Sequence, residues 1–129
     1  MQNVKLKITE QNVKFDIKIR SYKYALEVIK LIDSLTNSST TRILGDQLLR
    51  SATSIGANII EAQAASSRKD FKNFLNHALK SANETKFWLA LLRDSGKKSK
   101  EDMEPLLKEA KELSNILASS IITLKNKKF

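Results

Sequence analysis

Hydrophobic residues recur every three or four positions along most of the chain, which is the spacing of one buried face of a helix. The first predicted helix covers about residues 16–36, and its predicted buried face consists of Tyr22, Leu26, Ile29, Ile32 and Leu35. The second covers about residues 41–66 with Thr40 or Thr41 as its cap, and its buried stripe consists of Leu44, Leu48, Ala52, Ile55, Ile59 and Ala62.

Two further segments have the same spacing. The third predicted helix opens at a sequence that fits a capping box, Ser67 to Asp70, and ends at Gly96. Its apolar positions alternate in steps of four and three, the seam spacing of a left-handed bundle: Phe71, Leu75, Ala78, Ala82, Thr85, Leu89 and Leu92. The fourth helix begins near Ser99 or Asp102 and buries Leu106, Ala110, Leu113, Leu117, Ile121 and Leu124.

Short loops between four amphipathic helices imply antiparallel neighbours. The pattern therefore predicts an all-α fold, an antiparallel up-down-up-down four-helix bundle, over residues 16–129. Residues 1–15 alternate apolar and polar positions, so they are predicted to form an extended N-terminal arm. Gly45 and Gly56 each cost the second helix about 1 kcal/mol relative to alanine, which indicates that a neighbouring backbone approaches closely there.

The composition narrows the class of protein. A chain of 129 residues is long enough for one domain with a continuous core. The absence of cysteine excludes disulfides and suits a cytoplasmic location, and no apolar run is long enough to cross a membrane. With 23 basic against 14 acidic residues the net charge is +9, which favours anionic partners such as nucleic acid.

One stretch of the second helix resembles a known family. The run at residues 47–62, QLLRSATSIGANIIEA, is similar to the bacterial four-helix-bundle family encoded in intervening sequences of 23S rRNA genes. The third helix resembles the same family at Asp70-Phe71, Phe74-Leu75, Ala78, Ser81, Glu84 and Trp88-Leu89. The resemblance covers roughly residues 16–124. It implies a homopentameric ring without an established enzyme activity, distantly similar to the accessory protein of diversity-generating retroelements, a basic pentamer that associates with nucleic acid and a reverse transcriptase. Ala62 departs from the family pattern, which usually has glycine there.

Polar residues lie on one side of the second helix, namely Arg50, Asn58 and Glu61. In a hairpin that turns near Ser67, facing positions sum to about 135. Arg50 is therefore expected opposite Glu84, and Asn58 opposite His77. We interpret these five residues as interhelical polar contacts that fix the pairing of the two helices; a ligand or catalytic site is the alternative.

His77 is the only histidine, and a lone imidazole does not make a zinc site. The di-iron motif Glu-x-x-His is excluded because the residue three positions before His77 is Phe74, not glutamate. No metal and no cofactor is expected. His77 acting as a general base with Asp70 or Glu84 is the remaining catalytic interpretation, and the sequence contains no phosphate loop or nucleophile motif to support an enzyme.

A second apolar face on the third helix is formed by Phe74, Trp88 and Leu91. It fits either the broad face of an ordinary bundle or an interface between subunits, and the family resemblance favours the interface.

Charge is unevenly divided between the two ends of the predicted bundle. In this topology the start of the first helix, the loop between the second and third helices and the end of the fourth helix lie at one end, which we call the basic pole. Its acidic residues are Asp16, Glu61 and Asp70. Its nine basic residues are Lys14, Lys18, Arg20, Arg68, Lys69, Lys72, Lys125, Lys127 and Lys128. The opposite pole has five basic and six acidic residues: Arg42, Arg93, Lys97, Lys98 and Lys100 against Asp33, Asp46, Asp94, Glu101, Asp102 and Glu104. Such clustering is typical of a binder of phosphate backbones, and lysines that merely favour solubility are the alternative.

Together these patterns predict a non-enzymatic homo-oligomer, a pentamer if the resemblance holds, that binds RNA or DNA through the basic pole without strong sequence preference. The alternative is a scaffold for an unidentified protein partner.

Overall fold

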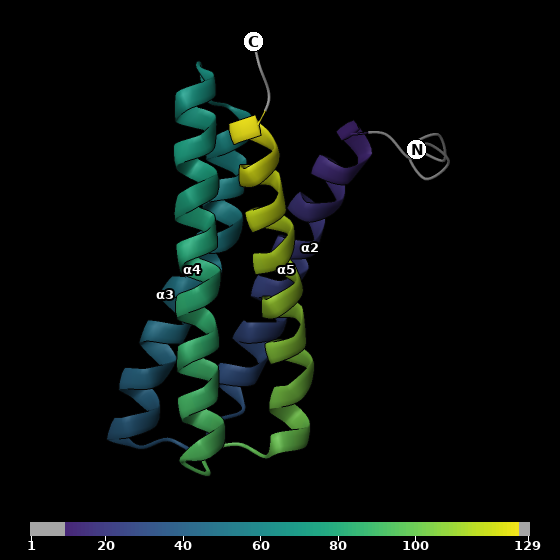
Figure 1. The fold of residues 1–129 in the computed structure, drawn as a ribbon. Coiled ribbons are helices and arrows are strands. Elements are labelled where there is room, and N and C mark those ends of the chain that lie inside the picture. Colours follow the sequence, from purple (N-terminus) through teal and green to yellow (C-terminus); the bar gives the residue numbers. More distant parts are fainter. Residues whose placement is uncertain (1–9, 127–129) are drawn as a thin grey trace.

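The computed structural model describes residues 10–126, and the side chains of residues 17–124. Four helices follow one another: α2 (Glu10–Asp33), α3 (Ser39–Gln63), α4 (Arg68–Asp94) and α5 (Lys100–Asn126) (Figure 1). Residues 10–126 contain no strand, so the predicted all-α four-helix bundle is confirmed. None of these helices combines the length and apolar character needed to span a membrane.

Local sequence explains where the helices begin and end. Ser38 caps α3: its hydroxyl accepts the Thr41 N–H, and the Thr41 hydroxyl accepts the Ser38 N–H in return. The prediction that Thr40 or Thr41 is the cap was wrong, because Thr41 is the other half of this capping box. Gly96 ends α4 with a φ of 76°, and the bond from Lys97 N–H to the Leu92 carbonyl completes a Schellman turn.

Consecutive helices are joined at alternate ends of the bundle (Figure 1). The start of α2, the turn between α3 and α4 and the end of α5 lie at one end, whereas the other two turns lie at the opposite end. Contacts between α2 and α5 run in opposite directions along the chain, since Arg20 meets Glu109 and Tyr24 meets Leu106. The first turns of α2 diverge from the other three helices (Figure 1).

The N-terminal boundary differs from the prediction. α2 begins at Glu10, so residues 10–15, predicted as part of an extended arm, are helical. The sequence permits both conformations. Val13, Ile17 and Tyr24 keep a helical spacing, although apolar and polar positions also alternate along residues 1–15. Residues 1–9 of the predicted arm lie outside the described part of the chain.

The buried face of α2 also differs from the prediction. Tyr24, Val28 and Leu31 are buried, with exposed fractions of 3%, 0% and 7%. Tyr22, Leu26 and Ile29, predicted to be buried, are exposed, and Ile32 and Leu35 are half-buried against the core. α2 has apolar residues on two sides, and its periodicity alone does not say which side the other helices cover.

The remaining core follows the predicted stripes. In α3 and α4 the predicted positions are buried except Leu44 and Phe71, which are half-buried. In α5 the predicted positions are buried except Leu124, which is half-buried. The glycines of α3 lie where α2 approaches. A Cβ on Gly56 would lie 3.2 Å from the Ser21 hydroxyl oxygen, and one on Gly45 would lie 3.4 Å from Ile32 Cγ2.

Candidate nucleic-acid interface

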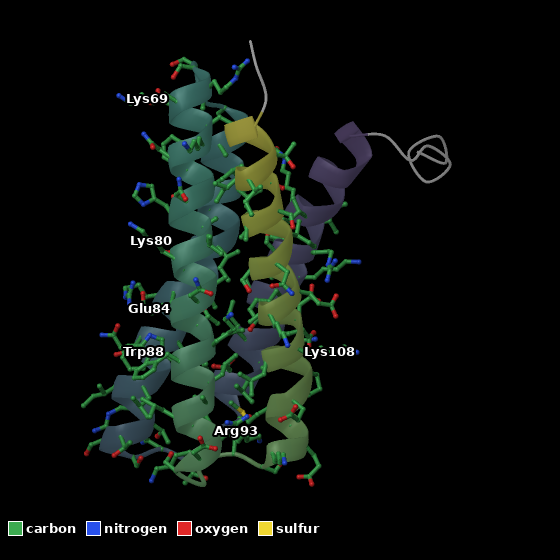
Figure 2. The ribbon with its side chains drawn as sticks, viewed as in Figure 1. Lys69, Lys80, Glu84, Trp88, Arg93 and Lys108 are labelled. Atoms are coloured by element: carbon green, nitrogen blue, oxygen red, sulfur yellow. The ribbon has the colours of Figure 1, made fainter. Side chains whose placement is uncertain are left out.

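The described part of the basic pole centres on the first turns of α4. Lys69 is exposed and Lys72 half-buried, and Arg68 is exposed at the first residue of the helix. Figure 2 shows Lys69 at this end of α4, far along the helix from Arg93. Among the described residues, no carboxylate lies within ion-pair distance of the Lys69 or Lys72 ammonium. Both charges therefore stay available to a solvent-borne anion.

Arg20, predicted as part of the basic pole, forms ion pairs within the molecule. Its guanidinium lies 2.7 Å from a Glu109 oxygen and 2.9 Å from a Glu112 oxygen, both on α5. A second nitrogen donates to Glu109 at 3.0 Å. This charge-assisted pairing joins α2 to α5 and satisfies the guanidinium within the molecule. Sequence spacing could not show that two glutamates of a distant helix face Arg20, and its contact with nucleic acid stays a prediction.

The other predicted members of the basic pole divide into two groups. Lys18 is exposed on the diverging part of α2. The side chains of four predicted members lie outside the described residues: Lys14, Lys125, Lys127 and Lys128. The backbone places Lys14 near the start of α2 and Lys125 in the last turn of α5, which are at the same end of the bundle (Figure 1).

At the opposite pole two of the five cations form ion pairs. Arg93 lies 2.8 Å from Asp94 and 3.7 Å from Glu104, and Lys98 lies 3.7 Å from Asp102. The hydrogen bond from Arg93 holds the pKa of Asp94 below its ordinary value. These two cations are thus neutralised locally, and the six acidic residues of this end balance its five basic ones.

The structure brings Arg50 and Glu84 together as an ion pair between α3 and α4. Arg50 also donates to Gln47 at 2.9 Å, and the Trp88 indole N–H donates to Glu84 at 2.9 Å. Directly beneath this cluster, the buried hydroxyls of Ser51 and Thr85 lie 2.9 Å apart. The polar residues therefore tie α3 to α4, which is a structural use of their charge.

Asn58, Glu61 and His77 are not joined in this way. The Asn58 amide donates to the Ser54 carbonyl at 2.9 Å, within its own helix. His77 is exposed, with its ring 6.4 Å from that of Phe74, and Glu61 is exposed. The expected pairing of Asn58 with His77 is wrong, because a short amide side chain reaches the carbonyl one turn back more readily than a neighbouring helix.

The apolar residues proposed for a subunit interface differ in exposure. Phe74 and Trp88 are half-buried and pack against the core, whereas Leu91 is 37% exposed. The predicted interface left out Phe87, which is 57% exposed and packs edge-on against Trp88. Its helical position beside Leu91, one turn away, was the available signal.

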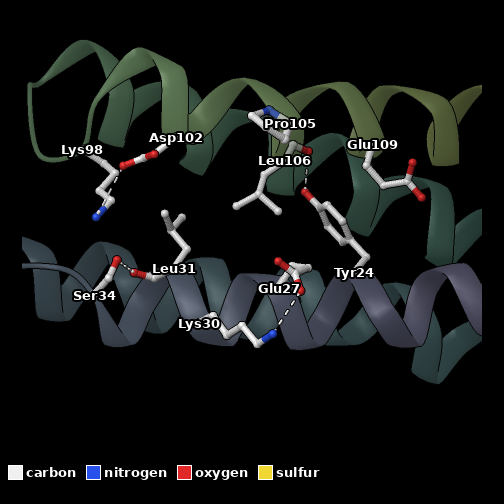
Figure 3. A pocket seen from close by; sticks show the side chains of 10 residues that line it. All are labelled: Tyr24, Glu27, Lys30, Leu31, Ser34, Lys98, Asp102, Pro105, Leu106 and Glu109. Atoms are coloured by element: carbon white, nitrogen blue, oxygen red, sulfur yellow. Dashed lines mark hydrogen bonds and ion pairs between the residues drawn. The ribbon is translucent and has the colours of Figure 1, made fainter.

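The groove between α2 and α5 has a volume of about 450 Å³ and is shown in Figure 3. The Tyr24 hydroxyl donates to the Leu106 carbonyl at 2.8 Å inside it. At its rim Lys30 pairs with Glu27, and Lys98 with Asp102. Polar groups of the groove thus bond one another rather than converge on a common point. Within residues 17–124, His, Asp and Glu side chains form no cluster of three able to hold a metal ion.

Comparison with known proteins identifies the family. The sequence model of the 23S rRNA-intervening sequence protein family matches residues 13–119. A crystal structure of a protein with unknown function from the S23 ribosomal protein family of Bacteroides thetaiotaomicron VPI-5482 is 42% identical over 81% of this chain and 97% of that chain, with a TM-score of 0.77. No curated protein matches. The chain belongs to the 23S rRNA-intervening sequence protein family.

Proposed function

We propose that this protein is a non-catalytic homo-oligomer that binds RNA or DNA through its basic pole without strong sequence preference. The observation that carries the proposal is the uneven charge of the two poles, with nine basic against three acidic residues at the basic pole and five against six at the other. Lys69 and Lys72 are unpaired among the described residues, whereas two of the five cations at the other pole, Lys98 and Arg93, lie beside carboxylates. Unpaired lysines attract phosphates most strongly because no internal partner must be displaced.

Lysine side chains are suited to contact the phosphate backbone of a nucleic acid rather than to recognise its base sequence. An ammonium on a flexible stem contacts phosphate as a point charge, and phosphate contacts carry no sequence information directly.

The experiment compares two triple variants that each remove three positive charges. Lys18→Gln, Lys69→Gln and Lys72→Gln together neutralise the described lysines of the basic pole. Lys97→Gln, Lys98→Gln and Lys100→Gln neutralise the opposite pole as a matched control. Binding to a labelled structured RNA and to a duplex DNA is measured between low and moderate salt.

Loss of a phosphate contact reduces the slope of log affinity against log salt by about 0.9 for duplex DNA and about 0.7 for single strands. We expect the basic-pole variant to bind more weakly and with a shallower slope on every sequence tested, and the control variant to bind nearly as wild type does. Equal loss in both variants would refute the basic pole as the site. A wild-type protein that binds neither nucleic acid at low salt would leave the scaffold function in its place.

A further inference from the structure

The outer side of α4 carries a line of polar side chains that starts at the basic pole and ends at an exposed aromatic ring. We call this line the α4 stripe; it comprises Lys69, Lys72, Asn76, Asn83 and Phe87. These positions fall within about 60° of one another around the helix and span about 27 Å along it. Phe87 is 57% exposed. The stripe thus joins the lysines of the pole to a ring two turns before the far end of α4.

The polar side chains of the α4 stripe are not used inside the molecule. Among the described residues they take part in no hydrogen bond and no ion pair. Between Asp70 and Asp94 the helix has one carboxylate, Glu84, and both Arg50 and the Trp88 indole bond to it. The donors of the stripe are therefore available to a partner from solution, and along this length of α4 no free carboxylate repels a phosphate.

The packing of α4 decides which kind of nucleic acid can use the stripe. α4 has a neighbour on each side, since Thr85 bonds to Ser51 of α3 and Lys86 bonds to Ser114 of α5. The major groove of B-DNA, about 12 Å wide, admits one helix, but it does not admit a helix lengthwise together with neighbours on both sides. A duplex therefore offers α4 its phosphates only. A single strand also offers unpaired bases, which stack on aromatic rings and bond to polar side chains.

From these observations we infer that a single strand of RNA or DNA runs along the α4 stripe. Its phosphates contact Lys69 and Lys72 at the basic pole, and further along α4 its bases meet the two asparagine amides and stack on Phe87. The inference rests on the nucleic-acid binding proposed above and names its substrate class. Stacking tolerates any sequence because every base has a π-face, which agrees with binding without strong sequence preference.

The surroundings of Phe87 suit a stacking platform. The ring centroids of Phe87 and Trp88 lie 5.0 Å apart in edge-on contact, and the indole N–H donates to Glu84. A ring that its neighbours hold in place loses little conformational freedom when a base stacks on it. Phe74 and Trp88, two of the residues predicted to meet another subunit, stand at least about 100° around α4 from the stripe. A subunit contact through them leaves the stripe accessible.

The first test compares a single strand with a duplex. Labelled RNA and DNA strands of about 12 nucleotides, within the length that single-strand sites occupy, are titrated alone and after annealing to their complements. Phe87→Ala is expected to weaken single-strand binding about 5- to 100-fold, which is the loss of one stacked base, and to leave duplex binding unchanged. Phe87→Tyr keeps the ring and is expected to bind as wild type does.

Tyr22→Ala is the matched control for Phe87→Ala. It also removes an exposed aromatic ring, since Tyr22 is 66% exposed, but this ring stands on α2, away from the stripe. The substitution is expected to change neither affinity.

The second test uses the fluorescence of Trp88, the only tryptophan of the chain. Because Trp88 contacts Phe87, a single strand that reaches the end of the stripe is expected to change the Trp88 emission. A duplex held at the pole lies about 27 Å away along α4 and is expected to leave the emission unchanged.

Three results would overturn the inference and leave the basic pole intact. In the first, wild type binds single strand and duplex equally and Phe87→Ala alters neither affinity. In the second, Phe87→Ala lowers the mass of the protein in solution without weakening single-strand binding, so that Phe87 is a protein contact. In the third, a duplex changes the Trp88 emission as strongly as a single strand does. Wild type that binds neither form at low salt removes the proposed function together with this inference.

Discussion

Tyr24 is a buried residue whose burial changes the pKa of its phenol. Its ring is 3% exposed and its hydroxyl donates to the Leu106 carbonyl at 2.8 Å, so α2 and α5 meet at this bond. Burial, with a smaller contribution from the charge of Glu109, raises the pKa of this phenol above its ordinary value of 10.0. The neutral form is thereby favoured in the folded protein.

The pKa of Tyr24 leads to a prediction about alkaline stability. Because the folded-state pKa is raised, the unfolded chain loses this proton first, and stability that is fully present below pH 10.0 falls as the pH rises above it. Tyr24→Phe, which lacks the hydrogen bond, should be less stable than wild type by about 1 kcal/mol at pH 7. Urea unfolding at a series of pH values should show the difference shrinking above pH 10.0. A constant or growing difference would contradict the role given to this hydroxyl.

At the scale of elements, the contact between α2 and α3 depends on small residues. The Ser21 hydroxyl would lie 3.2 Å from a Cβ on Gly56, so this side of α3 has room for a methyl group at most. Gly56→Leu should lower the free energy of unfolding by about 1–3 kcal/mol, because the larger side chain pushes α2 away.

Gly56→Ala is the control for that substitution. A small shift of the Ser21 side chain accommodates the methyl group, and the gain of about 1 kcal/mol in helix propensity offsets the crowding. Chemical unfolding of both variants measures the difference. If Gly56→Leu proves as stable as Gly56→Ala, α2 does not pack on α3 at this position as described.

At the scale of the whole molecule, the three lysines near the C-terminus test how far the basic pole extends. Lys125 stands in the last turn of α5, at the end of the bundle that holds Lys69 and Lys72, and Lys127 and Lys128 come next in the sequence. Replacing all three with glutamine should weaken nucleic-acid binding similarly across sequences and flatten its salt dependence.

A charge-matched control for the C-terminal substitutions comes from the middle of the bundle. Lys80, Lys108 and Lys111 are exposed there, and replacing them removes the same charge from a different place. Filter binding at several salt concentrations compares the two triple variants. Equal weakening would show that net charge, rather than its position at the pole, governs binding.

Much of the fold could be predicted because α3, α4 and α5 each have one long apolar stripe with a regular helical spacing. That stripe is the side that packs into the core, so Leu48, Ala82 and Leu113 are all buried as the pattern predicts. The pairing of Arg50 with Glu84 followed from the same regularity, since a short turn between two straight helices fixes which positions face each other.

The candidate site was less predictable, because it depends on partners from other helices. Arg20 belongs to the basic pole by position alone, and only the packing of α2 on α5 shows that Glu109 and Glu112 bind its guanidinium. That no described carboxylate pairs with Lys69 or Lys72 likewise became visible only once the surrounding side chains were placed.

The sequence by itself determined four helices, their order and the buried face of the last three, because those properties arise from local spacing and short connections. Only the tertiary structure decided which side of α2 is buried. That helix has two apolar sides, and the close approach of α3 at Gly56, with the bond from Tyr24 to α5, selects Tyr24, Val28 and Leu31 for the core. Tyr22, Leu26 and Ile29 remain exposed, because a helix at the corner of a four-helix bundle is covered by its neighbours on one side only.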